Sequence, residues 1–205
     1  HRLRTLRITK HSGKWIAQFS VTIPTTDKTD KRILGVDLGL KVPAVAITDD
    51  DKVRFFGNGR ENKYMKRKFR KLDDKEQRWM KDKDHKVSRK IVSFAVENQI
   101  SVIRLEQLTN IRQTTRTSCK NEKNLHKWSF YRLSTFIEYK ANIVGIKVEY
   151  VNPAYTSQSC PKCSEKNKAH DRTYKCQCGF EKHRDIVGAM NIRYTPVADG
   201  NSLSA

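Results

Sequence analysis

Ile33-Leu34-Gly35-Val36-Asp37 is a continuous apolar run that ends on a carboxylate. Short runs of branched aliphatic residues bounded by turn residues are typical of strands buried in a sheet. Two further strands are predicted close behind it, over residues 45–48 and 53–56, with the turn Asp49-Asp50-Asp51 between them. Strands joined by such tight connections predict an antiparallel meander that starts with residues 33–37.

Downstream, the pattern changes to alternating helices and strands. Apolar residues at helical spacing predict a helix over residues 60–83, a second one carrying Val87, Ile91 and Phe94, and a third over about 128–144 that Gly145 ends. Strands are predicted over residues 101–106 and 147–151, and a last short helix over about 185–193. This order predicts an α/β fold with a mixed sheet flanked by helices.

Residues 3–23 precede this core and predict a hairpin, because Trp15, Ala17, Phe19 and Val21 alternate strictly after a turn-prone segment. Residues 107–127 are polar and irregular, so we expect a mobile loop there. The tail from Pro196 is expected to be disordered.

The chain has 205 residues, with 42 Lys and Arg against 22 Asp and Glu, which gives a formal net charge of +20. No apolar run approaches the roughly 18 residues of a membrane span, and residues 1–20 lack the apolar core of a signal peptide. A surplus of this size indicates a polyanionic partner, nucleic acid before a membrane surface.

The basic charge is concentrated in residues 60–90, which hold 14 Lys and Arg against 6 Asp and Glu. A basic helix of this kind can neutralise phosphates, or it can simply be a solvated face. The candidate phosphate contacts are Lys63, Lys66, Arg67, Lys68, Arg70 and Lys71.

Four of the five cysteines lie in two tight pairs, Cys160 with Cys163 and Cys176 with Cys178, twelve residues apart. Four thiolates suit tetrahedral Zn²⁺, and a lobe of about 25 residues with so few apolar side chains would fold around the metal. Two disulfides or four free thiols are the alternative. The second pair is shorter than the usual Cys-x-x-Cys, which makes His183 a substitute ligand to test.

Four ligands would fill the zinc coordination sphere, so we expect this ion to be structural rather than catalytic. The fifth cysteine, Cys119, stands alone in the polar segment and is expected to be a free spectator thiol.

Three acids stand at the ends of predicted elements. Asp37 and Glu106 each end an apolar strand, and Asp185 opens the final helix. Ligands of open α/β sheets bind at strand ends, so neighbouring strands would bring these carboxylates into one cleft. Hard oxygen ligands select Mg²⁺ or Mn²⁺, and two such ions about 4 Å apart can promote phosphodiester hydrolysis. The alternative is an ordinary N-cap at Asp185 and a solvent-facing Glu106.

Several segments carry a resemblance to a known family. Residues 33–39 and 102–108 resemble the first two RuvC nuclease motifs, and Arg184-Asp185 with Asn191-Ile192 resembles the third. The segments 128–131 and 150–160 are similar to those before the zinc ribbon of transposon-encoded TnpB (OrfB) nucleases. Residues 1–24 resemble the end of the wedge domain that precedes the nuclease in that family.

The resemblance implies an RNase H-like (RuvC) fold with an inserted zinc ribbon. It implies that Asp37, Glu106 and Asp185 bind two Mg²⁺ (or Mn²⁺) ions and that the four paired cysteines hold structural Zn²⁺. Val187 departs from the family, which often has Asn there. The implied divisions are a wedge remnant at 1–27, RuvC core at 28–155, zinc ribbon at 156–183, final RuvC helix at 184–195 and a tail at 196–205.

The resemblance also implies a function. The implied protein is an RNA-guided endonuclease that cuts DNA with a single RuvC site. Its implied partners are a guide RNA and double- or single-stranded target DNA. The expected place is the prokaryotic cytoplasm, at the nucleoid when DNA is bound, and a monomer is expected. Most of the wedge and recognition regions have no counterpart here, so guided targeting is expected to need more than this chain.

Two alternatives remain open, a non-cleaving RNA-guided DNA-binding protein and a zinc-ribbon nucleic-acid-binding module. Relatives without the acids behave as binders, so the presence of all three acids favours the enzyme.

Overall fold

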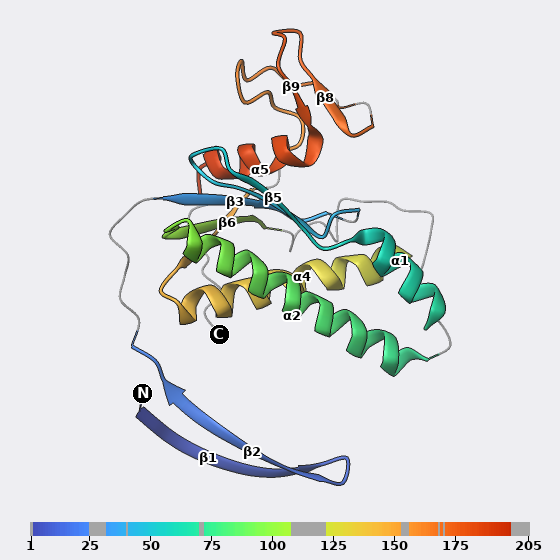
Figure 1. Ribbon diagram of the computed structural model, residues 1–205, viewed down its shortest axis with the longest axis vertical. Helices are drawn as coiled ribbons and strands as arrows, with labels where there is room; N and C mark the ends of the chain where they lie inside the picture. Colours follow the sequence, from blue (N-terminus) through green and yellow to red (C-terminus); the bar gives the residue numbers. More distant parts are fainter. Residues whose placement is uncertain are drawn as a thin grey trace.

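The computed structural model describes residues 2–24, 32–39, 41–69, 72–107, 122–152, 156–167, 169 and 171–197. Its centre is a five-stranded sheet of order β5-β4-β3-β6-β7 (Figure 1). Strands β3 (Ile33–Asp37), β4 (Ala44–Ile47) and β5 (Val53–Phe56) form the predicted antiparallel meander. Strands β6 (Val102–Glu106) and β7 (Lys147–Val151) pair in parallel on the other side of β3. The mixed sheet confirms the expected α/β, RNase H-like architecture.

Helices cover both faces of this sheet (Figure 1). On one face, α2 (Asp73–Glu97) and α4 (Glu122–Ile143) enclose the main apolar core, to which β3 contributes Leu34 and Val36. On the other face lies α5 (Arg184–Tyr194), which contacts β3 and β4. Side chains alternate along a strand, so the residues of β3 between the core positions face α5.

Helix α5 passes close over Gly35 of β3. A Cβ there would come within 2.1 Å of the carbonyl oxygen of Ala189, so only glycine allows the helix this near the strand. The far end of α5 is held by Arg104 of β6, whose Nη1 donates to the carbonyl oxygens of Arg193 at 2.6 Å and Thr195 at 3.3 Å. A cation at the C-terminal end of a helix is favourable, and these contacts fix α5 across the sheet.

The predicted N-terminal hairpin is present as β1 (Arg2–His11) and β2 (Lys14–Thr22). Ser12 and Gly13 form its turn with φ of 48° and 77°, the left-handed pair that a type I′ hairpin turn requires.

The helices differ from their predicted bounds. The helix expected over 60–83 is two helices, because α1 (Gly59–Lys68) ends at Phe69 and α2 runs unbroken from Asp73 to Glu97. The spacing of apolar residues stays in phase across this break, so periodicity alone predicts one continuous helix where the structure has two. Asn58 caps α1 by accepting from the N–H groups of Arg60 and Glu61.

Helix α4 begins at Glu122, so residues 122–127, expected in a loop, are helical. It ends as predicted before Gly145, which has φ of 72°. Residues 108–121 with Cys119, residues 70–71, and residues 198–205 of the expected tail lie outside the described residues. None of the helices in the described part of the chain combines the length and apolar character of a membrane span.

Residues 156–183, here called the cysteine lobe, connect the sheet to α5. The lobe contains a small antiparallel ribbon of β8 (Thr173–Lys175) and β9 (Glu181–His183) (Figure 1). Its apolar cluster joins Cys160, Tyr174 and Cys176 to Val187 of α5. Helix α5 therefore packs against the sheet and also completes the core of the lobe.

Candidate metal centres

Strands β3 and β6 place Asp37 and Glu106 side by side at one end of the sheet. The strands pair in parallel up to Val36 with Leu105, so Asp37 and Glu106 are the next residues of the same register. Both belong to the face that α5 covers, because they lie two residues beyond Gly35 and Arg104, which contact that helix. The predicted meeting of two strand-terminal acids therefore occurs beneath α5.

Asp37 is the most enclosed of the three predicted acids. Burial raises its pKa to about 8, with further increases from the charges of Glu106 and Asp185 and an opposing effect of Arg184. Helix α5 lies directly against this carboxylate, since a Cβ at Gly188 would be 2.8 Å from Oδ2. A buried carboxylate beside two others is costly to ionise without a cation, which is the electrostatic situation that a divalent metal relieves.

Glu106 is held by one residue of the cysteine lobe. Thr156 donates a hydrogen bond from Oγ1 to Oε1 of Glu106. Burial raises the pKa of Glu106, and the hydrogen bond from Thr156 opposes that increase. The Glu106 side chain is therefore partly buried and hydrogen-bonded, which argues against the alternative of a solvent-facing acid.

Asp185 lies in the first turn of α5 but does not cap it. The N-cap is His183, whose Nδ1 accepts from the backbone N–H of Asp185 at 3.3 Å. The carboxylate Oδ2 of Asp185 instead lies 3.7 Å from Nη1 of Arg172 and 4.0 Å from Nδ1 of His183. The N-cap alternative is therefore wrong for Asp185, whose carboxylate instead lies beside Arg172.

The three carboxylates are spread more widely than the cysteines. Across the described ranges, only the four cysteines form a group of three or more metal-ligating side chains with donor atoms all within 4.8 Å of one another. A single ion would need all three acids as close as that, whereas two ions about 4 Å apart distribute the ligands over two centres. Among the described residues, Asp37, Glu106 and Asp185 therefore do not form a group of that closeness.

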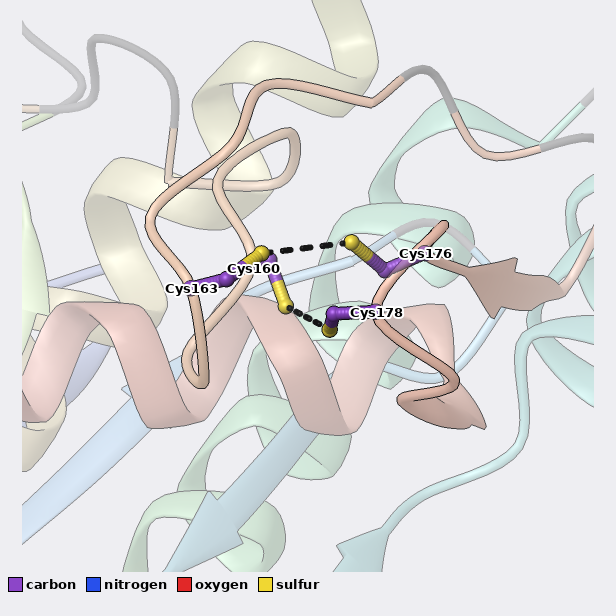
Figure 2. Close-up of side chains that lie close together, drawn as sticks. All are labelled: Cys160, Cys163, Cys176 and Cys178. Atoms are coloured by element: carbon purple, nitrogen blue, oxygen red, sulfur yellow. Dashed lines mark hydrogen bonds between the residues drawn. The ribbon is translucent and has the colours of Figure 1, made fainter.

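The four cysteines of the lobe converge (Figure 2). Sγ of Cys163 lies 3.4 Å from that of Cys176, and Sγ of Cys160 lies 3.7 Å from that of Cys178. Zn–S bonds of about 2.3 Å in a tetrahedron imply sulfur separations of about 3.8 Å, so the arrangement fits structural Zn²⁺. No disulfide joins these four cysteines, so the two-disulfide alternative is not what the fold shows, and four free thiols are the alternative to the zinc site. The short Cys-x-Cys pair still reaches the centre.

Neighbouring residues support this centre. Asn167 donates from Nδ2 to Sγ of Cys176 at 3.2 Å, a contact that orients the sulfur. Burial raises the pKa of the Cys160 thiol, but the backbone N–H groups of Cys163 and Lys162 prevail and lower it to about 7. The substitute ligand His183 is not part of the group, since it caps α5 instead.

The predicted basic helix is α1. Lys63, Arg67 and Lys68 are exposed on it, together with Tyr64, which is 63% exposed. Lys66 lies on the same helix, and Arg70 and Lys71 are outside the described residues. The solvated-face alternative and phosphate contact both remain compatible with this exposure.

Two residues near the acids, Thr156 and Arg172, escaped sequence reasoning. A lone Thr or Arg in a polar segment has no periodicity or spacing that marks it. The available signals were the resemblances, since the TnpB-like segment from Tyr150 to Cys160 includes Thr156 and the third RuvC-like motif includes Asn191.

Comparisons with known proteins agree with these features. The family model "Cas12f1-like, TNB domain" matches residues 130–192. A TnpB-like protein of Methanocaldococcus jannaschii is 39% identical over 136 residues, which are 64% of this chain and 49% of that protein. CRISPR-associated endodeoxyribonuclease Cas12f1 of Sulfoacidibacillus thermotolerans is 34% identical over 140 residues, 66% of this chain and 31% of the relative.

The fold is also that of a solved Cas12f1 in complex with sgRNA and target DNA. The TM-score is 0.65 at 21% identity, over 92% of this chain and 55% of that one. The chain thus spans about half of the TnpB-like relative and a third of the Cas12f1 relative. With a family model that matches residues 130–192, related sequences along 64% and 66% of its length and a common fold, the chain belongs to the TnpB/Cas12f family.

Proposed function

We propose that this chain is the nuclease portion of an RNA-guided DNA endonuclease and that Asp37, Glu106 and Asp185 hold two Mg²⁺ (or Mn²⁺) ions. The observation that carries this proposal is the parallel register of β3 and β6, which places Asp37 and Glu106 side by side beneath α5, the helix whose first turn holds Asp185. Two relatives that carry the name CRISPR-associated endodeoxyribonuclease support the class of reaction.

Each acid has a distinct position in the proposed mechanism. Asp37, enclosed by α5, would hold the ions together with Glu106, which Thr156 orients, and Asp185 of the first turn of α5. Divalent ions bound there supply an activated water and stabilise the leaving oxygen of a phosphodiester. Arg172 lies beside Asp185 with its side chain 38% exposed, and its positive charge favours an approaching phosphate.

Guide RNA and target DNA are the proposed partners. The net charge of +20 and the exposed cations of α1 provide the non-specific attraction that such partners need. A protein that acts on chromosomal DNA in this way would work at the nucleoid of a prokaryotic cell.

The test is a cleavage assay on a labelled single-stranded DNA oligonucleotide, with and without RNA, in Mg²⁺, Mn²⁺ or neither. We expect cleavage that requires the divalent ion in the wild-type chain and no cleavage in Asp37→Ala. Unchanged cleavage in Asp37→Ala would show that the active site lies elsewhere.

Isothermal titration with Mn²⁺ separates the enzyme from the non-cleaving binder. The enzyme should bind Mn²⁺ through the three acids, and Asp37→Ala should lose that binding. A chain that binds nucleic acid but takes up no Mn²⁺ would instead be a binder, since a binder has no use for an ion in the cleft.

A further inference from the structure

Thr156 connects the cysteine lobe to one of the three acids. Its side chain is buried, with 4% exposure, and its Oγ1 donates to Oε1 of Glu106. The last torsion of a Glu side chain is broad, so an unrestrained carboxylate would rotate freely at the end of β6. A hydrogen bond from a buried hydroxyl fixes that rotation.

The backbone of Thr156 is fixed in turn by α5. Asn191 donates from Nδ2 to the carbonyl oxygens of Thr156 at 2.6 Å and Ser159 at 2.8 Å. One amide group therefore spans the segment between Thr156 and Cys160, the first cysteine of the candidate zinc site.

The same segment is fixed from the lobe side. The hydroxyl of Tyr174 donates to the carbonyl oxygen of Gln158 at 3.1 Å, and the backbone N–H of Asn167 donates to it at 2.9 Å. Tyr174 is fully buried beside Cys160 in the apolar cluster of the lobe. The position of the segment thus depends on a folded lobe.

We propose that Thr156 is a positioning residue for Glu106 and that Asn191 and Tyr174 make its position depend on the cysteine lobe. The proposal rests on the proposed role of Glu106 as a metal ligand. Binding of a divalent ion by the acids is then coupled to folding of the lobe around zinc. Linkage requires the coupling to be reciprocal, so each metal strengthens binding of the other by the same factor.

The first experiment compares Thr156→Val, which keeps the shape but loses the hydroxyl, with Thr156→Ser, which keeps the hydroxyl. The matched control is Thr135→Val, because Thr135 is exposed on α4 and bonds only locally, to the carbonyl oxygen of Tyr131 at 2.9 Å. Mn²⁺ affinity of the 205-residue chain is measured by titration calorimetry, and thermal unfolding checks the fold of each variant.

Thr156→Val should weaken Mn²⁺ binding about tenfold, which corresponds to about 1.4 kcal/mol. Thr156→Ser and Thr135→Val should keep the wild-type affinity. Wild-type affinity in Thr156→Val, or an equal loss in Thr135→Val, overturns the positioning role.

The second experiment tests the dependence on the lobe. Asn191→Leu keeps the branching at Cγ but removes both hydrogen bonds to the segment. Tyr174→Phe, which keeps the buried ring, replaces it if the first variant does not fold. Either should weaken Mn²⁺ binding several-fold and release zinc faster to a chelator. Unchanged values for both metals overturn the coupling.

The two proposals fail differently. If the wild-type chain binds no Mn²⁺, or Asp37→Ala binds it equally well, the proposed function is wrong. If the wild type binds Mn²⁺, Asp37→Ala does not, and Thr156→Val matches the wild type, only the positioning role is wrong.

Discussion

A methyl group on Gly188 would lie 2.8 Å from Oδ2 of Asp37, so α5 contacts that carboxylate with no space for a side chain. The atom that an added Cβ would displace is Oδ2 of Asp37, which is the end of a side chain and not part of the backbone. Gly188→Ala should therefore move the Asp37 carboxylate and leave the fold intact.

We predict a separation of activity from stability in Gly188→Ala. Alanine favours a helix interior over glycine by about 1 kcal/mol, so thermal stability should stay or rise. Displacement of a catalytic group by about 1 Å can lower the rate about 10²-fold. Cleavage rate and melting temperature, measured on the same preparation, check this, and a variant that loses both would contradict it.

Gly35→Ala should behave in the opposite way. Its Cβ would meet the carbonyl oxygen of Ala189 at 2.1 Å, which is backbone that cannot rotate aside. We expect a loss of roughly 1–3 kcal/mol or more of unfolding free energy, because α5 must move off β3. Urea unfolding of Gly35→Ala and Gly188→Ala side by side measures the difference, and equal midpoints would refute it.

The pH dependence of stability should report on Asp37. Its pKa in the fold is raised from 3.8 to about 8, so the protonated form stabilises the fold below about pH 4 and this contribution is lost as pH rises to about 8. Without added Mg²⁺, the free energy of unfolding should fall by up to about 1.4 kcal/mol for each pH unit between about pH 4 and pH 8.

Asp37→Asn should remove this slope, because an amide does not ionise. The variant should be more stable than wild type at pH 8.5 in Mg²⁺-free buffer with stoichiometric zinc, and the gap should shrink at pH 5. Unfolding midpoints at the two pH values test this, and parallel pH profiles for the two proteins would count against it.

Removal of zinc should unfold the cysteine lobe before the sheet. Cys163→Ser deletes one of four ligands, so we expect loss of bound zinc and rapid proteolysis within residues 160–183 while the main core resists. Cys119→Ser, the predicted spectator, serves as the control and should retain full zinc content. Metal analysis and limited proteolysis decide, and full zinc retention in Cys163→Ser would exclude the four-cysteine site.

The basic helix α1 should contribute through phosphate contacts. Lys63→Ala and Arg67→Ala should each reduce the slope of log affinity against log salt by about 0.7–0.9, depending on single- or double-stranded partner. Lys147→Ala is the matched control, since Lys147 is exposed and pairs with Glu149 at 3.1 Å on an edge strand far along the sheet order. Fluorescence anisotropy over a salt series measures the slope, and identical slopes would leave α1 as a solvated face.

The strands and their terminal acids were predictable because burial on both faces leaves a continuous apolar run, and an acid that ends such a run stands out. Asp37 and Glu106 could be placed at strand ends from this signal alone. The cysteine group was predictable from spacing. None of these inferences needed long-range information.

The rest depends on contacts that spacing does not encode. The break between α1 and α2 at Phe69 left the apolar period unchanged, and the hydrogen bond from Thr156 to Glu106 joins residues 50 positions apart. His183 follows Cys178 by five residues, a spacing that favours a zinc ligand, but α5 begins directly after it and its ring accepts from the backbone N–H of Asp185 as the N-cap.

Val187 stands where the related family often has Asn, and its apolar surroundings explain why this chain has a valine. The side chain is fully buried against Cys160, Tyr174 and Cys176, so an apolar residue suits the position.

That burial has a consequence for efforts to shrink the molecule. The apolar core of the cysteine lobe includes Val187 of α5, so the lobe cannot be deleted and replaced by a short linker without exposing that side chain. A trimmed protein would leave Val187 facing water and would need a hydrophilic replacement there to remain soluble.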